Sequence, residues 1–383
     1  MRKVLISLTV IMSVLLVGYG FSYAISGQCA NCHTMHASQN GSWIGDPDIT
    51  KHRSLLKFGC QACHTGSTGE KNGDAPIVYH TTAPTGQGNG KTLAGGDFYW
   101  VTQVSGDNKG HNVEGVGSVG EDQLIGNNAP GFVPPGWDAT ATSVGYTFGA
   151  VAPNGWTQQV TCAGEFGCHG KHGLGVDIWA GVSGGHHGNI GGTASQVTTP
   201  ATTVGGSYRF LNGITGLEDA NWNWGENAST HNEYSGVNDT SARNTEVGAG
   251  DYAGARTAGT ISFLCAECHG RYHASIASGA TGASPWLRHP TDVVLPGDAS
   301  KEYSNYTAYS VQAPIARPDL TSIADHAVVV PGTDIVMCLS CHRAHGSDQP
   351  DLLRWDYSGM VAGTTGGSAG TGCFVCHRNK DGV

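Results

Sequence analysis

The stretch Cys29-Ala-Asn-Cys32-His33-Thr-Met-His36 determines what kind of fold the chain can form. Two cysteines three positions apart, followed at once by histidine, are the attachment signature of c-type haem, in which both thiols bond to one porphyrin and the histidine ligates iron. All 12 cysteines of this 383-residue chain fall into such pairs. We therefore predict six c-type haems. The cysteine pairs and their proximal histidines are Cys29, Cys32 and His33; Cys60, Cys63 and His64; Cys162, Cys168 and His169; Cys265, Cys268 and His269; Cys338, Cys341 and His342; and Cys373, Cys376 and His377.

Two other interpretations of the cysteines were weighed. A disulfide framework suits a secreted chain rich in cysteine, and structural zinc uses the same residue types. Neither explains a histidine after every pair in a chain with only 18 histidines. The third site differs from the others because five residues, not two, separate Cys162 from Cys168. A free dithiol stays open there as the alternative to haem.

The supply of further histidines predicts the second ligand of each iron. Twelve histidines lie outside the motifs, whereas only Met35, Met337 and Met360 follow the leader. Two histidine ligands per iron are therefore expected, which favours low reduction potentials. A histidine directly after a motif, such as His36 or His172, is expected to reach a neighbouring haem. His186 and His187 in a Gly-Gly-His-His-Gly stretch, and His231, are interpreted as surface residues and not as ligands.

Composition predicts the fold class. Glycine accounts for 59 residues and charged residues for only 13%, so long segments have few side chains to bury. We expect a mostly irregular chain with a few short helices and short strands, whose core is six stacked haems. Short helical turns are expected at the motifs, and brief strands at 98–104 and 207–211.

The N-terminus predicts export. Arg2 and Lys3 precede an apolar run that ends near Tyr19, and Ser22-Tyr-Ala24 offers a cleavage site. We expect a signal peptide at 1–24 and a single hexahaem unit at 25–383, with an uncleaved anchor as the alternative. The net charge of −10 without a basic cluster argues against nucleic acid or an anionic membrane as partner.

No enzyme site is predicted. The stretch Gly115-Val-Gly-Ser-Val-Gly120 matches a dinucleotide-binding pattern, but no strand pattern precedes it, so it is interpreted as a loop. No nucleophile–base arrangement is evident, and no catalytic residue is assigned.

The order and flanks of the motifs resemble the OmcS-type hexahaem cytochromes, outer-surface proteins of metal-reducing bacteria that polymerise into conducting filaments. The resemblance rests on the first motif with His36 and on four later stretches. These are Gly95-Gly-Asp-Phe98 with Trp100-Val101, Lys109-Gly-His111-Asn112, Trp286-Leu-Arg288-His289-Pro290 and Cys338-Leu-Ser-Cys341-His342-Arg-Ala-His345. The mature N-terminus is shorter than in the family, and residues 173–259 match poorly.

The resemblance implies six stacked haems with two histidine ligands each. It also implies that His36 ligates the fifth haem, at Cys338, Cys341 and His342, of an adjacent copy. Eight histidines stand at family positions for six distal places, so at least two do not ligate, and His52 could replace one. The eight are His36, His80, His111, His172, His273, His289, His326 and His345.

The expected function is therefore extracellular electron transfer along filaments of this chain. The expected partners are copies of itself, redox partner cytochromes and extracellular acceptors such as metal oxides. A monomeric periplasmic or outer-surface shuttle is the first alternative, and a multihaem reductase of a small inorganic substrate is the second.

Overall fold

The structure is a computed structural model that describes residues 28–36, 38–39, 42–43, 55–57, 59–73, 75–84, 92–116, 134–136, 159–172, 175–187, 203–218, 227–238, 259–269, 272, 289–363 and 370–378. The proposed signal peptide at 1–24, His52 and His273 lie outside these residues. Regular elements are short, and the longest described helix, α7 (Ile261–Ala266), has 6 residues. The prediction of a mostly irregular chain with short helices and strands is confirmed.

Helical turns form at five of the motifs, as expected. They are α2 (Cys29–Cys32), α3 (Gln61–His64), α7, η6 (Cys338–Ser340) and η9 (Gly372–Val375). A turn of helix brings the two cysteines of a CxxC unit onto the same side of the backbone, because residues three apart are neighbours on a helix. The other described helices are α5 (Ile178–Gly181), η3 (Val204–Gly206), η4 (Tyr208–Phe210), η5 (Glu302–Asn305), η7 (Pro350–Leu352) and η8 (Tyr357–Gly359).

The strands of the described residues form small sheets. The largest has the order β11-β13-β12-β10-β9, built from Val293–Val294, Ile335–Val336, Ala316–Arg317, Glu233–Ser235 and Gly216–Leu217. Four two-stranded sheets pair β1 (Ser38–Gln39) with β2 (Ser42–Trp43), β3 (Thr65–Gly66) with β6 (Tyr79–His80), β4 (Lys71–Asn72) with β5 (Ala75–Pro76), and β7 (Thr161–Ala163) with β8 (Gly167–His169). Strands of two or three residues hold neighbouring loops together without forming a layer.

The third motif is not helical, and this expectation was wrong. Cys162 lies on β7 and Cys168 on β8, and the register pairs Thr161 with Gly167 and Ala163 with His169. The three extra residues of the motif form the turn between these strands. Gly164 in that turn has φ +85°, and a Cβ there would press against the backbone of Val176. The two cysteines therefore end up opposite each other despite their longer spacing.

The two predicted strands are also not formed. Residues 98–104 are turns, and Tyr208–Phe210 within 207–211 form the 3-10 helix η4. Both stretches contain apolar residues of the kind that strands use, but Phe98 and Tyr208 are buried by packing against other loops. None of the described helices is long and apolar enough to cross a membrane.

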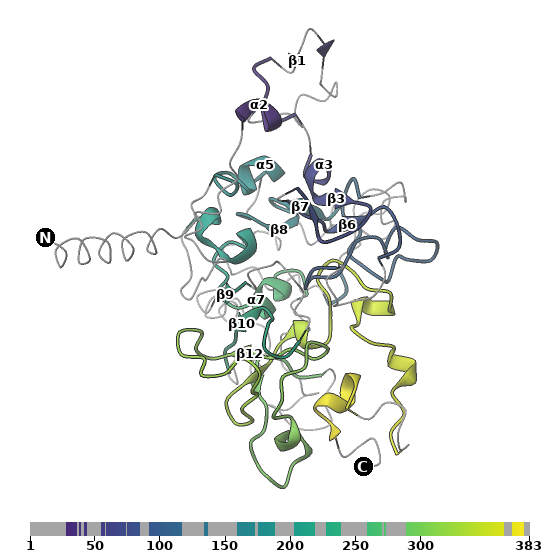
Figure 1. Cartoon of the computed structure of the whole chain (residues 1–383), viewed down its shortest axis with the longest axis vertical. Coiled ribbons are helices and arrows are strands. Elements are labelled where there is room, and N and C mark those ends of the chain that lie inside the picture. The colour runs from purple at the N-terminus through teal and green to yellow at the C-terminus, as the bar shows by residue number, and fades with distance from the viewer. Residues whose placement is uncertain are drawn as a thin grey trace, which may run out of the picture.

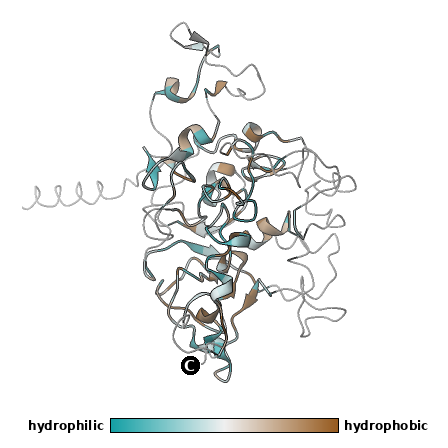
Figure 2. Cartoon of the chain, turned by 90° about the vertical axis from the view of Figure 1, so that its right-hand side faces the viewer, coloured by the Kyte–Doolittle hydropathy of each residue, from teal (hydrophilic) through white to brown (hydrophobic). Residues whose placement is uncertain are grey.

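The apolar core is divided into separate clusters beside the motifs. One cluster contains Tyr306, Tyr309 and Trp355, and Cys341, Cys373 and Cys376 pack against it. A second includes Tyr208, Tyr234 and Met337. Figure 2 shows hydrophobic and hydrophilic stretches alternating along the chain instead of forming one apolar layer. In Figure 1, α2 and β1 lie at the top, away from the main body of the molecule.

Candidate functional site

Five of the six proximal histidines each have a second histidine ring close by. The rings come from distant parts of the chain, and no pair lies within one element. The ring-centre separations are 5.9 Å for His33 and His187, 6.2 Å for His64 and His186, 6.3 Å for His169 and His345, 6.1 Å for His269 and His111, and 6.1 Å for His377 and His289.

This separation fits a single iron between the two rings. A metal–imidazole bond is about 2.0–2.1 Å, and a ring centre lies about 1 Å behind its nitrogen, so rings on opposite faces of one iron are about 6 Å apart. Direct stacking would bring the rings closer, as it does for His231 and Tyr309 at 3.6 Å. The spacing of these pairs is thus what a haem with two histidine ligands requires.

The hydrogen bonds of these rings leave the ligating nitrogen available. Within the described part of the chain, the paired rings His64, His169 and His269 form their hydrogen bonds through Nδ1, each to a backbone carbonyl oxygen at 2.6–2.9 Å. The rings of His111 and His289 do the same, to Ala344 and Pro290. A hydrogen bond from Nδ1 fixes the tautomer and the ring orientation, and it is the usual second-shell contact of a metal-bound histidine.

Loss of solvation lowers the pKa of seven of the ten paired rings. Loss of solvation lowers the pKa of His169 and of His269 to about 4, and that of His345 to about 3. The pKa values of His64, His111, His186 and His289 are also lowered, with burial as the largest cause. Only a neutral imidazole has a lone pair for iron, so these rings are in the ligating form at pH 7.

Cysteines of successive motifs lie near one another in chain order. The thiol of Cys162 lowers the pKa of Cys60, and the thiol of Cys338 raises the pKa of Cys265, so the second motif neighbours the third and the fourth neighbours the fifth. At the other three junctions, burial first and then the charge of a cysteine in the adjacent motif raise the pKa of a thiol. These junctions are Cys63 with Cys32, Cys268 with Cys168, and Cys341 with Cys373. The six motifs therefore form one continuous series.

Two of the distal candidates, His80 and His172, are in none of the five ring pairs that the described residues form. His80 is buried, and its Nδ1 lies 2.5 Å from Asp97 Oδ2 while its Nε2 lies 2.7 Å from the carbonyl oxygen of Gly69. His172 contacts Glu267 through Nδ1 at 3.1 Å and the carbonyl oxygen of Cys168 through Nε2 at 2.9 Å. Both nitrogens of each ring are thus hydrogen-bonded to the protein in this structure, and the assignment of these two residues as distal ligands stays a prediction.

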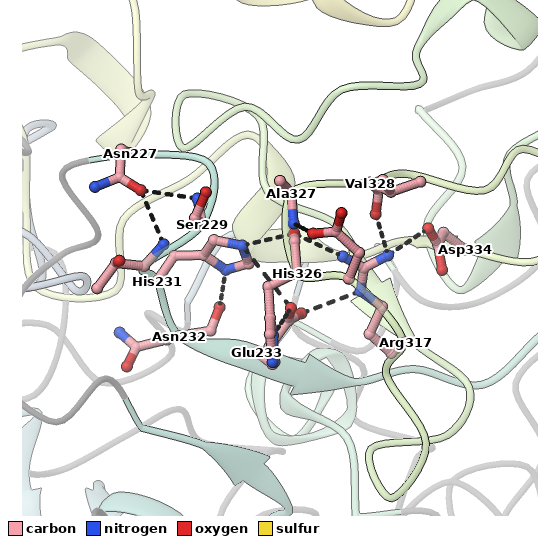
Figure 3. Close-up of polar contacts among 12 residues, drawn as sticks. Asn227, Ser229, His231, Asn232, Glu233, Arg317, His326, Ala327, Val328 and Asp334 are labelled. Atoms are coloured by element: carbon pink, nitrogen blue, oxygen red, sulfur yellow. Dashed lines mark hydrogen bonds and ion pairs between the residues drawn. The ribbon is translucent and has the colours of Figure 1, made fainter.

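His326, a third distal candidate, is exposed and contacts a buried network of charges that lies beside His231 (Figure 3). The His326 Nδ1 lies 2.9 Å from Glu233 Oε1, and Arg317 donates to Glu233 at 3.1 Å and to Asp334 at 2.7 Å. His231 and His326 have ring centres 6.2 Å apart, but His231 stacks on Tyr309, and its Nε2 bonds to the carbonyl oxygen of His326. This pair belongs to no motif, and its hydrogen bonds distinguish it from the five others.

The fifth proximal histidine stands apart from the rest. His342 is exposed, and its Nδ1 lies 2.7 Å from the carbonyl oxygen of Asp351. Among the described residues, no histidine ring faces it at the spacing of the other pairs. His36 is likewise exposed and follows α2 on the part of the chain that lies at the top of Figure 1. Of the remaining candidates, His111, His289 and His345 are each placed beside a proximal histidine.

His186 and His187 lie beside proximal histidines, which sequence reasoning did not foresee. They face the proximal histidines of the second and first motifs, and both are exposed, as their glycine-rich surroundings predicted. They follow α5, whose first turn is capped by the Asp177 carboxylate, which accepts the N–H groups of Trp179 and Ala180 at 3.0 Å. The sequence feature that could have indicated their position is that the two histidines are adjacent, because adjacent side chains point in different directions and can reach two neighbouring sites.

Comparison with known proteins agrees with these motifs. Residues 326–382 match the family model of the doubled CXXCH motif. Motifs of this kind are those of multihaem c-type cytochromes, which are proteins of electron transport.

The chain is a distant homologue of the C-type cytochrome OmcS of Geobacter sulfurreducens, with 26% identity over 408 aligned residues that cover 92% of this chain and 84% of that protein. Two solved structures of the OmcS filament from the same organism align over 94% of this chain and 93% of theirs. The two structures share 19% and 20% sequence identity with this chain, and their TM-scores are 0.44 and 0.45.

Proposed function

We propose that this chain binds six c-type haems in a continuous series and that copies of it join end to end into an extracellular filament that conducts electrons. When bound, each haem supplies one iron that accepts and releases one electron. The thioether cysteines are those of the six motifs, and the six motif histidines are the proximal ligands.

The ring pairs support the assignment of distal ligands. We assign His187 to the first haem, His186 to the second, His345 to the third, His111 to the fourth and His289 to the sixth. His273 lies outside the described residues and stays a prediction. With two neutral histidines on each iron and no methionine, the haems are expected at low potential, which suits transfer to external acceptors.

The proximity of successive motifs supports conduction along the chain. Because the cysteines of each motif lie near those of the next in chain order, adjacent haems would lie close to each other from the first to the sixth. Two buried arginines beside the fifth motif fit the propionate groups that a haem brings. Burial lowers the pKa of Arg354 to about 10 and that of Arg343 well below its usual value, and a nearby carboxylate would stabilise both charges.

The single observation that carries the filament is the difference between His342 and the other proximal histidines. His342 has no partner ring within the described part of its own chain, whereas the exposed His36 lies on a segment set apart from the main body. A contact from His36 of one copy to the iron at His342 of the next joins two different surfaces, and such head-to-tail interfaces extend into open filaments. Export, redox partner cytochromes and acceptors such as metal oxides are part of this proposal.

In a monomer, none of the described histidine rings would occupy the second face of the iron at His342. That state favours the second candidate function, reduction of a small inorganic substrate, because an open coordination position is what such chemistry needs. The third candidate function is a monomeric electron shuttle, in which another ligand fills this position on the iron.

Electron microscopy of the native protein, together with variants of His36, tests the proposal. We expect filaments from the parent chain, monomers with one high-spin haem from His36→Ala, and restored assembly from His36→Met, because methionine also ligates haem iron. Imidazole added to the His36→Ala monomer should return that haem to low spin. Unchanged filaments from His36→Ala would contradict the inter-subunit bond, and parent monomers with six low-spin haems would favour the shuttle.

A further inference from the structure

The proximal histidines differ in what accepts the Nδ1–H hydrogen bond. At four motifs the acceptor is a backbone carbonyl oxygen, whereas at the sixth it is a carboxylate. The carbonyl acceptors are Pro76 for His64, Arg209 for His169, Pro135 for His269 and Asp351 for His342, at 2.6–2.9 Å. At the sixth motif, His377 Nδ1 lies 2.9 Å from Oε1 of Glu302.

The contact between Glu302 and His377 is positioned by the local fold. Glu302 is the first residue of η5 (Glu302–Asn305), and the adjacent Tyr303 places its ring edge-on to the His377 ring at 5.1 Å. The side chain of Glu302 is 12% exposed and that of His377 is 28% exposed. A charged hydrogen bond shielded to this degree is stronger than one in open water.

We propose that Glu302 is a tuning residue that lowers the reduction potential of the sixth haem below the potentials of the haems whose proximal histidines donate to carbonyls. This inference rests on the proposed function, in which His377 holds a haem iron. A carboxylate draws the Nδ1 proton more strongly than a carbonyl does, so the imidazole donates more electron density through Nε2. An electron-rich ligand stabilises the oxidised iron more than the reduced iron.

The sixth haem, when bound, would then be a better electron donor than the haems whose proximal histidines donate to carbonyls. The difference would come from one side chain and not from the identity of the iron ligands, which are two histidines at each paired site.

The sixth site can be recognised by spectroscopy. The planes of His289 and His377 meet at 89°, whereas those of the other four pairs meet at 22–47°. Ferric haems with near-perpendicular imidazoles have an electron paramagnetic resonance signal distinct from that of haems with more parallel ones. The potential of this haem can therefore be followed separately in a redox titration monitored by that signal.

The test compares Glu302→Gln with Asp298→Asn in the intact holoprotein. Glu302→Gln keeps the shape and an oxygen acceptor but removes the charge. Asp298→Asn removes an equal charge from a nearby exposed turn, where the carboxylate bonds to Ser300. We expect Glu302→Gln to favour reduction of the sixth haem about 10-fold, a rise of about 59 mV for one electron. Glu302→Asp should give part of this shift, and Asp298→Asn should leave the potential near the parent value.

Two results would overturn the inference. Either the sixth-site signal keeps its potential in Glu302→Gln, or Asp298→Asn shifts it equally, which would show a general charge effect. Failure of the proposed function is detected separately by intact mass. If replacing Cys373 and Cys376 with alanine does not remove one haem, the site holds none and both proposals fail. A full haem count with an unshifted potential refutes the role of Glu302 alone.

Discussion

Replacing His187 or His186 with alanine should each convert one low-spin haem into a high-spin haem. His187 faces His33 at 5.9 Å, and His186 faces His64 at 6.2 Å, so each substitution removes the distal ligand of a different iron. The proximal histidine and both thioether bonds would remain, and the haem count should not change. The affected iron loses a strong nitrogen donor, and its potential should rise.

The expected magnitude follows from the number of sites. With six motifs, each single substitution should shift about one sixth of the haem signal to high spin, and the double substitution about one third. His231→Ala is the matched control. Its ring is buried and held by hydrogen bonds to Asn232 and His326, so we expect no high-spin haem but a loss of about 1–3 kcal/mol of unfolding free energy.

The assay is electron paramagnetic resonance of the oxidised protein, with the haem count of each variant checked by intact mass. The reasoning is refuted if His187→Ala and His186→Ala keep all haems low-spin while His231→Ala produces a high-spin haem. That pattern would mean that the buried network and not the tandem supplies the ligands.

Three further predictions concern stability, each measured by denaturant unfolding. Burial alone would lower the pKa of His80, but the hydrogen bond and charge of Asp97 outweigh it and raise that pKa. The stabilisation that Asp97 provides should therefore be complete below a pH of about 6.5 and should be lost as the pH rises through the raised pKa of His80. A difference in unfolding free energy between parent and Asp97→Asn that stays constant with pH would contradict this. Gly96→Ala should lose more than the ~1–2 kcal/mol expected for Gly69→Ala. Both glycines have φ near +80°, but only at Gly96 would an added Cβ meet the carbonyl oxygen of Gly346. Equal losses of unfolding free energy in the two variants would refute this clash. Arg317→Met should lose about 3–5 kcal/mol because two buried carboxylates lose their cation, and a loss within experimental error would show that the network is dispensable.

Local chemistry made much of this protein predictable from the sequence. Haem attachment depends on residues that are neighbours in the chain, so the cysteine pairs and the following histidines could be identified by spacing alone. The irregular fold was also predictable, because a chain with 59 glycines and few charged residues has little apolar surface of its own to bury. The clusters that do form pack beside the cysteines, as they do around Tyr306 and Trp355.

Which histidine meets which was decided only by the tertiary structure. His345 lies 176 positions from His169, and His111 lies 158 positions from His269, and no local pattern encodes such pairings. The sequence contained more histidines than were needed, and only the structure shows that the rings of His80, His172 and His326 lie beside Asp97, Glu267 and Glu233 and not beside a proximal histidine of the described residues. The same holds for Glu302, which lies 75 positions from His377. A second ligand and its tuning partner approach from outside the motif, so their identity depends on how distant loops pack and not on spacing along the chain.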